Sequence, residues 1–370
     1  MAPRLESPEL YTIAWIATLP IGRAAATALL HEEHDEPDGF IRHDRDNNSY
    51  SWGRLGQHNI VIASLQAGVY GITSAAFTAS DLIHSLPHIG IGLLVGIGGG
   101  IPQPDEGSDI RLGDVVVGQP DGTTGGVVQY DLGKAKTGGV WEQKGSLNKP
   151  PPVLLHALAS LQARHEMMPS KIPELLKAML DANNCFMTKK NSNYTYPGAQ
   201  NDRLFKSEYT HVDGLTCAKC DRTWEVEREE RESTDPEIHY GIIASGNSLI
   251  EDAATRDSLL DRHQFLCVEM EAAGLMDRFP CLVICGICHY ADSHKNGRWE
   301  RYAAATAAAF AAELLEYVPA KKVQETRKVI QAVQPLQDKM NILRRASISA
   351  QYIDSTIALD WLPDTEGARF

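Results

Sequence analysis

The sequence lacks the features of several protein classes. Its net charge is −13 and its densest charged run, residues 225–232, is mostly acidic, so nothing attracts nucleic acid at long range. No apolar run approaches the ~20 residues of a membrane span, and residues 1–10 have no apolar signal-peptide core. It has neither a dinucleotide-type glycine spacing nor a P-loop lysine. We therefore expect a soluble, cytoplasmic protein with no nucleic-acid or membrane partner and no cofactor.

Cysteine is sparse and its pattern excludes a disulfide framework. The chain has an odd number of cysteines, at positions 185, 217, 220, 267, 281, 285 and 288. Cys217 and Cys220 form a C-x-x-C that could be half of a zinc site only if His211 and His239 fold back as ligands. No second pair follows, and a structural zinc site needs four ligands. The sequence therefore favours a plain loop and predicts no metal site.

The histidines of His31–His34 (HEEH) are three residues apart. A zinc-protease helix needs two histidines four residues apart. We predict a polar helix end at this segment instead.

The apolar pattern predicts an α/β fold. Short β-branched runs bounded by glycine are typical of strands buried on both faces; they lie at 11–17, 59–65, 91–97, 114–118, 241–246 and 281–287. Apolar residues at three- and four-residue spacing predict helices between many of them, at 21–33, 72–85, 153–164 and 172–183. Their alternation indicates a three-layer fold with a mostly parallel, twisted central sheet flanked by helices.

Chain length and periodicity suggest one large domain and a tail. A chain of 370 residues with 43% apolar residues can bury a substantial core, and we place that domain at 1–318. Periodicity fades over 184–237, a stretch too long for a structureless loop, which we interpret as a lid or an insertion. Residues 319–370 are expected to form a helical tail or linker.

Mostly parallel sheets flanked by helices bind ligands at the carboxyl ends of their strands.

Four stretches, in a consistent order, resemble the nucleoside phosphorylase and nucleosidase superfamily. They are residues 11–20, 93–118, 239–248 and 267–317, and the resemblance covers about residues 9–318. It is strongest to the purine/uridine phosphorylase-like domains that precede nucleotide-binding regions in many multidomain fungal proteins. Relatives complete their sites by forming dimers, trimers or hexamers, so the resemblance implies a homo-oligomer acting on a small molecule.

The resemblance also implies a substrate pocket. Its glycine-rich loop, Gly98 and Gly99, would bind phosphate or water, because glycine lets backbone N–H groups approach an anion closely. In the stretch VEMEAAGL, Met270 would pack against the sugar and Glu271 would accept hydrogen bonds from ribose hydroxyls. Taken alone, the same stretch is a helix start with acidic residues near the positive end of its dipole. The later strand and loop add Ser245 and Asn247 as substrate-binding residues.

Three charged residues of the family's site are replaced here. His289 stands where relatives have the aspartate that protonates the leaving base, and Cys285 stands where they have an arginine four residues earlier. Gly22 stands where hydrolytic relatives have the glutamate that activates water. Acid–base assistance contributes roughly 10²–10⁴-fold, and a glycine supplies none. His289, with an ordinary pKa near 6.5, or the nearby Asp292 are the remaining candidates for a catalytic proton donor.

Three functions fit these replacements. Loss of three charges predicts a roomier, less polar pocket, so we favour a cofactor-free enzyme acting on a neutral apolar small molecule. An intramolecular cyclase of Diels–Alder type in secondary metabolism is one example, with His289 as a hydrogen-bond donor. The first alternative is a nucleoside phosphorylase or nucleosidase that cleaves an N-glycosidic bond using His289 or Asp292. The second is a catalytically silent ligand-binding or assembly module.

Overall fold

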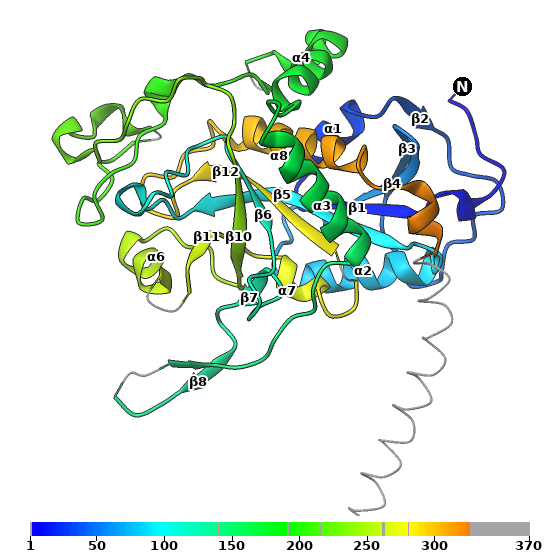
Figure 1. The fold of residues 1–370 in the computed structure, drawn as a ribbon, viewed down its shortest axis with the longest axis horizontal. Helices are drawn as coiled ribbons and strands as arrows, with labels where there is room; N and C mark the ends of the chain where they lie inside the picture. Colours follow the sequence, from blue (N-terminus) through cyan, green and yellow to red (C-terminus); the bar gives the residue numbers. More distant parts are fainter. Residues whose placement is uncertain are drawn as a thin grey trace, which may run out of the picture.

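The computed structural model describes residues 2–138, 141–190, 192–214, 216–260, 263–279 and 281–325. Most of its strands join one large twisted sheet (Figure 1). These strands are β1 (Ile13–Ala17), β2 (Glu32–His34), β3 (Tyr50–Leu55), β4 (His58–Ser64), β5 (Ile91–Gly100), β6 (Val115–Gly118), β7 (Val127–Gln129), β10 (Ile238–Ser245), β11 (Phe265–Glu269) and β12 (Cys281–His289). A separate hairpin, β8 (Gly133–Ala135) and β9 (Trp141–Gln143), projects from the body.

The centre of the sheet is parallel, as predicted. Its strand order is β11-β10-β6-β12-β5-β1-β4-β3-β2, and β4, β1, β5 and β12 run parallel to one another. One feature was not foreseen. β11 also pairs antiparallel with the end of β5, where Cys267 opposes Gly100 and Val268 opposes Gly99. The sheet therefore closes on itself through β5, β12, β6, β10 and β11.

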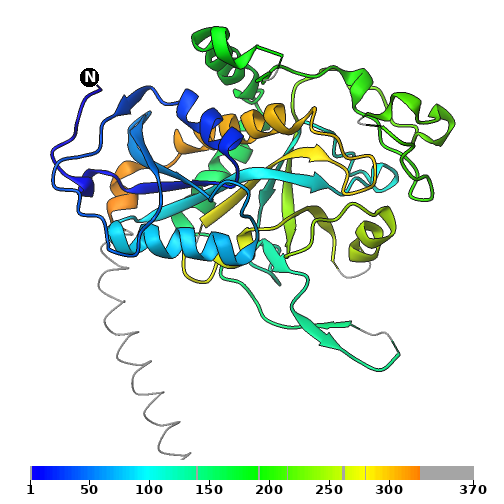
Figure 2. The ribbon, with the colours of Figure 1, turned by 180° about the vertical axis from the view of Figure 1, so that it is seen from behind.

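Helices cover both faces of the sheet and give the predicted three layers (Figures 1 and 2). They are α1 (Pro20–Ala28), α2 (Ile72–Ser85), α3 (Pro152–His165), α4 (Ile172–Ala182), α5 (Asn184–Met187), α6 (Ala253–Leu260), α7 (Ala272–Leu275) and α8 (Glu300–Leu315). α8 lies on β5 and β12 and also contacts α1, α3 and α4, whereas α2 packs against α7. The predicted helices 72–85, 153–164 and 172–183 are confirmed by α2, α3 and α4.

The predicted helix at 21–33 is wrong in its second half. α1 ends at Ala28, and Glu32–His34 forms β2, which pairs antiparallel with β3. His34 is buried, and its Nδ1 atom lies 2.8 Å from the Tyr11 hydroxyl. Burial of this histidine against aromatic side chains outweighs the local helical pattern, so the polar helix end predicted there is wrong as well.

Segment 184–237 contains little regular structure, as its fading periodicity suggests. Besides α5 it holds three short 3₁₀ turns, η3 (Ala199–Asn201), η4 (Cys217–Lys219) and η5 (Arg222–Trp224); two more, η1 (Pro8–Leu10) and η2 (Pro104–Glu106), lie elsewhere. Its role as a lid or insertion stays a prediction. So does the tail at 319–370, of which residues 326–370 lie outside the described residues.

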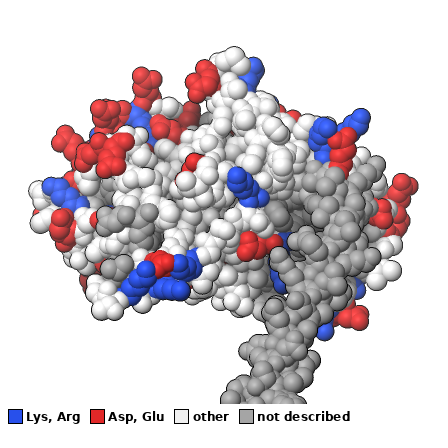
Figure 3. Space-filling model, turned by 60° about the horizontal axis from the view of Figure 1, so that its bottom comes forward, with Lys and Arg blue, Asp and Glu red and all other residues white. Residues whose placement is uncertain are grey.

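The described surface agrees with the acidic composition. On the face in Figure 3, Lys and Arg side chains occur in small separate groups, and the middle of the face is largely uncharged. The described residues of this face form no continuous basic surface. None of the described helices has the length and apolar character needed to cross a membrane.

Candidate functional site

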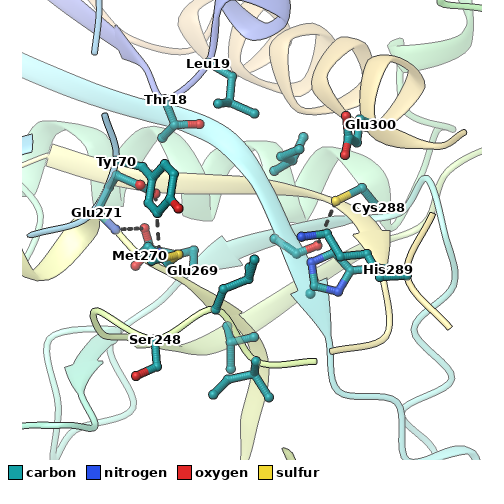
Figure 4. A pocket seen from close by; sticks show the side chains of 17 residues that line it. Thr18, Leu19, Tyr70, Ser248, Glu269, Met270, Glu271, Cys288, His289 and Glu300 are labelled. Carbon is teal, nitrogen blue, oxygen red and sulfur yellow. Dashed lines mark hydrogen bonds between the residues drawn. The ribbon is translucent and has the colours of Figure 1, made fainter. Parts of the chain in front are cut away.

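A pocket of about 220 Å³ lies where β5, β11 and β12 end (Figure 4). Its wall also includes the loop after β1, the loop before α2, the loop after β10 and the first turn of α8. This is the carboxyl-end position expected for ligands of a parallel sheet. The volume is small beside the ≈ 300–1,000 Å³ of drug-sized ligand sites. A compact ligand therefore fits it better than an extended apolar one.

The glycines of the pocket belong to a strand, so the predicted glycine-rich loop is wrong. Gly98 and Gly99 lie within β5 and line the pocket. A Cβ on Gly98 would stand 2.9 Å from the backbone oxygen of Val268, and one on Gly99 would stand 2.7 Å from Cε1 of His289. These contacts explain glycine by close packing between paired strands. They also make room for the His289 ring.

Two buried glutamates form the acidic wall. The Glu271 carboxylate accepts hydrogen bonds from the backbone N–H groups of Gly71 (3.0 Å) and Met270 (3.3 Å). Glu269 accepts from the N–H groups of Glu271 and Ala272, both at 2.9 Å, and so caps α7. Burial raises the pKa of both carboxyls, and the charge of Glu271 raises the pKa of Glu269 further. Met270 and both glutamates line the pocket.

His289 ends β12 and faces the pocket with a neutral ring. Burial, followed by the positive charge of Lys295, lowers the pKa of His289 to about 4. The Nδ1 atom accepts a hydrogen bond of 3.0 Å from the backbone N–H of Ala291. Since that nitrogen is an acceptor, the proton of the neutral imidazole lies on Nε2. Near neutral pH the ring is therefore a hydrogen-bond donor that carries no extra proton to transfer.

Ala291, two residues after His289, has φ = 53°, the only positive φ among the described non-glycine residues. Strained backbone of this kind persists where the surroundings over-determine it. Here it brings the Ala291 N–H within reach of the His289 ring. The strained backbone at Ala291 therefore helps to fix the tautomer of His289.

The other predicted site residues lie outside this pocket lining. Ser245 accepts a hydrogen bond of 2.9 Å from the Ala273 N–H, and the Asn247 side chain bonds Asp131 at 3.3 Å. Asp292 faces a second, smaller cavity on the other side of the β12 end. The remaining two are buried in the protein core, Gly22 in α1 and Cys285 in β12. Neither of these two residues lines the pocket.

Sequence reasoning did not assign several polar side chains that line the pocket to the site. Thr18 follows β1, Tyr70 precedes α2, Ser248 follows β10, Glu269 ends β11, Lys295 lies between β12 and α8, and Glu300 begins α8. Lys295 forms an ion pair of 3.2 Å with Glu251. Thr18 lies in the stretch 11–20, and Glu300 lies in the stretch 267–317. Their place in stretches that resemble the superfamily was the only signal that could have found them.

Two groups of side chains could hold a metal ion among the described residues. In the first, Asp114, Glu237 and His239 come together, but the Asp114 carboxylate already binds Arg231 at 2.8 Å and His239 at 3.0 Å. The second unites Cys217 and Cys220 with His211. His239 lies in the first group, so only one of the two histidines considered as ligands joins the cysteine pair.

The fold matches that of nucleoside phosphorylases and nucleosidases. Futalosine hydrolase of Helicobacter pylori aligns over 84% of this chain and 99% of its own, with 14% identity and a TM-score of 0.51. The 5′-methylthioadenosine/S-adenosylhomocysteine nucleosidase of Neisseria meningitidis, in complex with methylthio-immucillin-A, aligns over 83% and 99% with 16% identity and a TM-score of 0.50. At these identities the likeness establishes the fold and nothing finer.

Sequence comparison gives a nearer relative. A nucleotide-binding leucine-rich repeat (NLR)-like protein of Hyaloscypha variabilis is 41% identical over 309 residues. That match takes in 84% of this chain but 29% of the relative, so the chain spans less than a third of that protein's length. No protein-family model matches the chain.

Proposed function

We propose that the protein is a nucleosidase-type hydrolase that binds a small nucleoside in the β5–β11–β12 pocket and cleaves its N-glycosidic bond. The observation that carries the proposal is the charge of the pocket wall, where the carboxyl groups of Glu269, Glu271 and Glu300 face one ammonium group, Lys295. Cleavage of an N-glycosidic bond builds positive charge on the sugar, and preorganised acidic groups stabilise developing positive charge.

Glu271 is the proposed ribose-binding residue. Each of its carboxylate oxygens accepts one backbone N–H, which leaves lone pairs free for hydroxyl donors. The two backbone hydrogen bonds fix the carboxylate without neutralising it. Met270 precedes it in the same turn and supplies an apolar surface beside it.

His289 is proposed to contact the base. Its Nε2–H donates a hydrogen bond to the leaving group near neutral pH, and the imidazolium can transfer a proton when the pH falls towards about 4. Water attacks the sugar carbon as the carbon–nitrogen bond breaks, the imidazolium proton passes to the leaving base, and the water gives its proton to a carboxylate. Glu300 is the proposed base for that water, because Glu269 and Glu271 already accept backbone N–H donors.

Water is favoured over phosphate as the attacking group. A dianion would enter a pocket with three carboxyl groups. Of the expected phosphate-binding residues, Gly99 is paired on both sides, with β12 and with β11, and Gly98 is paired with Ile287 of β12. Phosphate should therefore not accelerate the reaction.

The test is a base-release assay on inosine, adenosine, methylthioadenosine and ATP, with and without phosphate. We expect slow, phosphate-independent release that rises as the pH is lowered from 7 towards 5. His289→Gln should abolish the rise, and Glu271→Gln should raise KM and lower kcat. His156→Gln, in an exposed position of α3, is the matched control and should leave both constants unchanged. Absence of release at every pH would contradict the hydrolase.

A ligand-binding module without turnover is the second candidate function. It is favoured by the 41% identity to an NLR-like protein and by the low pKa of His289, which leaves little imidazolium at neutral pH. On this proposal the chain belongs to the phosphorylase and nucleosidase superfamily and has lost the acid. Nucleoside binding in calorimetry without base release would select it over the hydrolase.

The cyclase stays a prediction. The pocket of about 220 Å³ combines apolar side chains with three carboxyl groups and has no Phe or Trp in its wall, so a compact ligand with both apolar and hydroxyl groups fits it better than a large hydrocarbon. A search with neutral apolar metabolites becomes the next step only if nucleosides neither bind nor react.

We also propose a homo-oligomer. Tyr70 and Leu249 line the pocket and are 62% and 49% exposed. Val69 and Phe77, which are close to Tyr70 in the sequence, are exposed as well. Large apolar side chains around a site are often covered by a second subunit. Light scattering after size exclusion should give a multiple of the 40.6 kDa chain mass.

A further inference from the structure

We propose that His211, Cys217, Cys220 and His294 bind one zinc ion, in a site separate from the pocket. One Sγ or imidazole nitrogen from each of the first three residues lies within 4.8 Å of the others. Ligands about 2.0–2.3 Å from a tetrahedral zinc stand roughly 3–4 Å from one another. These three atoms are already gathered at nearly the required separation, whereas the His294 ring lies beside this group and would move towards it on binding zinc.

The cysteine turn is held in place by residues outside it. Cys217 begins η4 and Cys220 caps its end, through a hydrogen bond of 3.0 Å from the Cys220 N–H to the Cys217 oxygen. The Arg203 guanidinium donates to the backbone oxygens of both cysteines, and Glu225 holds the guanidinium at 2.7 Å. A preformed C-x-x-C turn lowers the entropic cost of binding a metal ion.

His294 is the independent observation that points to a ligand. The residue is 6% exposed, and its Nε2 has no hydrogen-bond partner among the described residues. Its Nδ1 lies 3.4 Å from the Asp292 carboxylate, with which it forms an ion pair when the ring is protonated. A buried polar atom left unpaired is destabilising, so the unpaired Nε2 and the direction of Nδ1 towards Asp292 need an explanation.

Zinc ligation explains them. The His294 and His211 ring centroids are 5.5 Å apart at 74°, and two imidazoles on one tetrahedral zinc have centroids about 5 Å apart. His294 stacks on Phe205 at 4.1 Å, which fixes its plane. Metal-bound histidines commonly direct the second ring nitrogen at a carboxylate; here Nε2 would bind zinc and Nδ1 would face Asp292.

The ion would clamp segment 184–237 to the chain that follows β12. Three ligands come from that segment and the fourth from the loop between β12 and α8, which also carries Lys295 of the pocket wall. Other contacts already join the two, since the His211 N–H donates to Ser293 at 3.0 Å and the Cys217 thiol approaches the His294 oxygen at 3.7 Å. The proposed role is structural and does not depend on the nucleosidase proposal.

The test measures zinc in the full chain purified without added metal or chelator, by elemental mass spectrometry. We expect about one zinc per chain, loss of zinc in a Cys217→Ser/Cys220→Ser double variant, and retention in Lys219→Ala, an exposed position in the same turn. His294→Gln should weaken zinc at least tenfold in competition with a chromogenic chelator. Unchanged affinity would overturn His294 as the fourth ligand.

A measurement on the native chain covers the case in which variants do not fold. Cobalt added after zinc removal should give the visible spectrum of a tetrahedral thiolate site, and chelator should lower the melting temperature. Thiol titration of the denatured, zinc-free protein should find all seven cysteines reduced. Two missing thiols would indicate a Cys217–Cys220 disulfide, and that outcome, or zinc no higher than in the double variant, overturns the site.

Discussion

A single side chain, His289, sets the chemistry available to the pocket. Its place in the sequence marks the departure from the motif that the sequence resembles, but its protonation depends on burial and on Lys295, which no motif reveals. Gly22 and Cys285 show that a motif also does not reveal which residues line the pocket. The sequence grouped them with His289 as one altered site, whereas both are packed in the core and only His289 lines the pocket.

Burial of neutral His289 should make the fold acid-sensitive. Its folded pKa of about 4 lies below the unfolded value near 6.5, so the unfolded chain binds the proton more readily. Stability from this residue is complete above pH 6.5 and falls as the pH drops towards 4, by an amount on the order of 3 kcal/mol. Urea unfolding from pH 7 to 4.5 should show a smaller decline for His289→Gln.

The matched control for this measurement is again His156→Gln. Because His156 is exposed, its removal should leave the pH dependence of the unfolding midpoint as it is in the native chain. Identical acid slopes for His289→Gln and the native protein would refute the assignment of a depressed pKa to His289.

Among the elements, α8 and β12 show how small residues set the packing. The alanines of α8 bring its backbone close to the sheet, and a Cβ built on Gly286 would stand 1.9 Å from the backbone oxygen of Ala303. The strand at β12 was predicted from its apolar run, whereas no helix was assigned to the residues of α8. β2 and the second pairing of β11 were not predicted, because each depends on pairing with another strand.

Replacement of Gly286 by alanine should push α8 away from β12. Overpacking of this kind costs about 1–3 kcal/mol or more, so the urea midpoint should fall clearly. Gly22→Ala is the control, because its Cβ would meet no atom nearer than 3.7 Å and alanine favours a helix by up to about 1 kcal/mol. An equal loss in both variants would contradict the close α8–β12 contact.

At the scale of the whole molecule, charged residues attach segment 184–237 to the sheet. Asp114, at the start of β6, is 1% exposed and binds Arg231 twice, at 2.8 Å each, and His239 at 3.0 Å. Burial alone would raise the pKa of Asp114, but hydrogen bonds and charge from Arg231 and His239 outweigh it and lower the pKa. The sequence showed 225–232 only as an acidic run, since its partners lie elsewhere in the chain.

Loss of Arg231 should therefore destabilise the protein strongly. Arg231→Met leaves a buried carboxylate without its main partner, which typically costs about 3–5 kcal/mol. The loss should shrink as the pH falls below the ordinary Asp value near 3.9 and the carboxyl is protonated. Arg54→Met, which removes an ion pair with 43% exposed side chains, should cost less than about 1 kcal/mol. Equal urea midpoints for the two variants would contradict this role for Arg231.

The closure of the sheet through β11 and β5 has a consequence for how the protein meets its ligand. Gly99 is paired with β12 on one side and with β11 on the other, so the pocket floor is a ring of paired backbone. Amide protons there should exchange with solvent only when the whole domain opens. The rim, at Tyr70 and Leu249, lies in loops and should exchange far faster. Ligand selection would then depend on how the rim adapts to a floor that does not move.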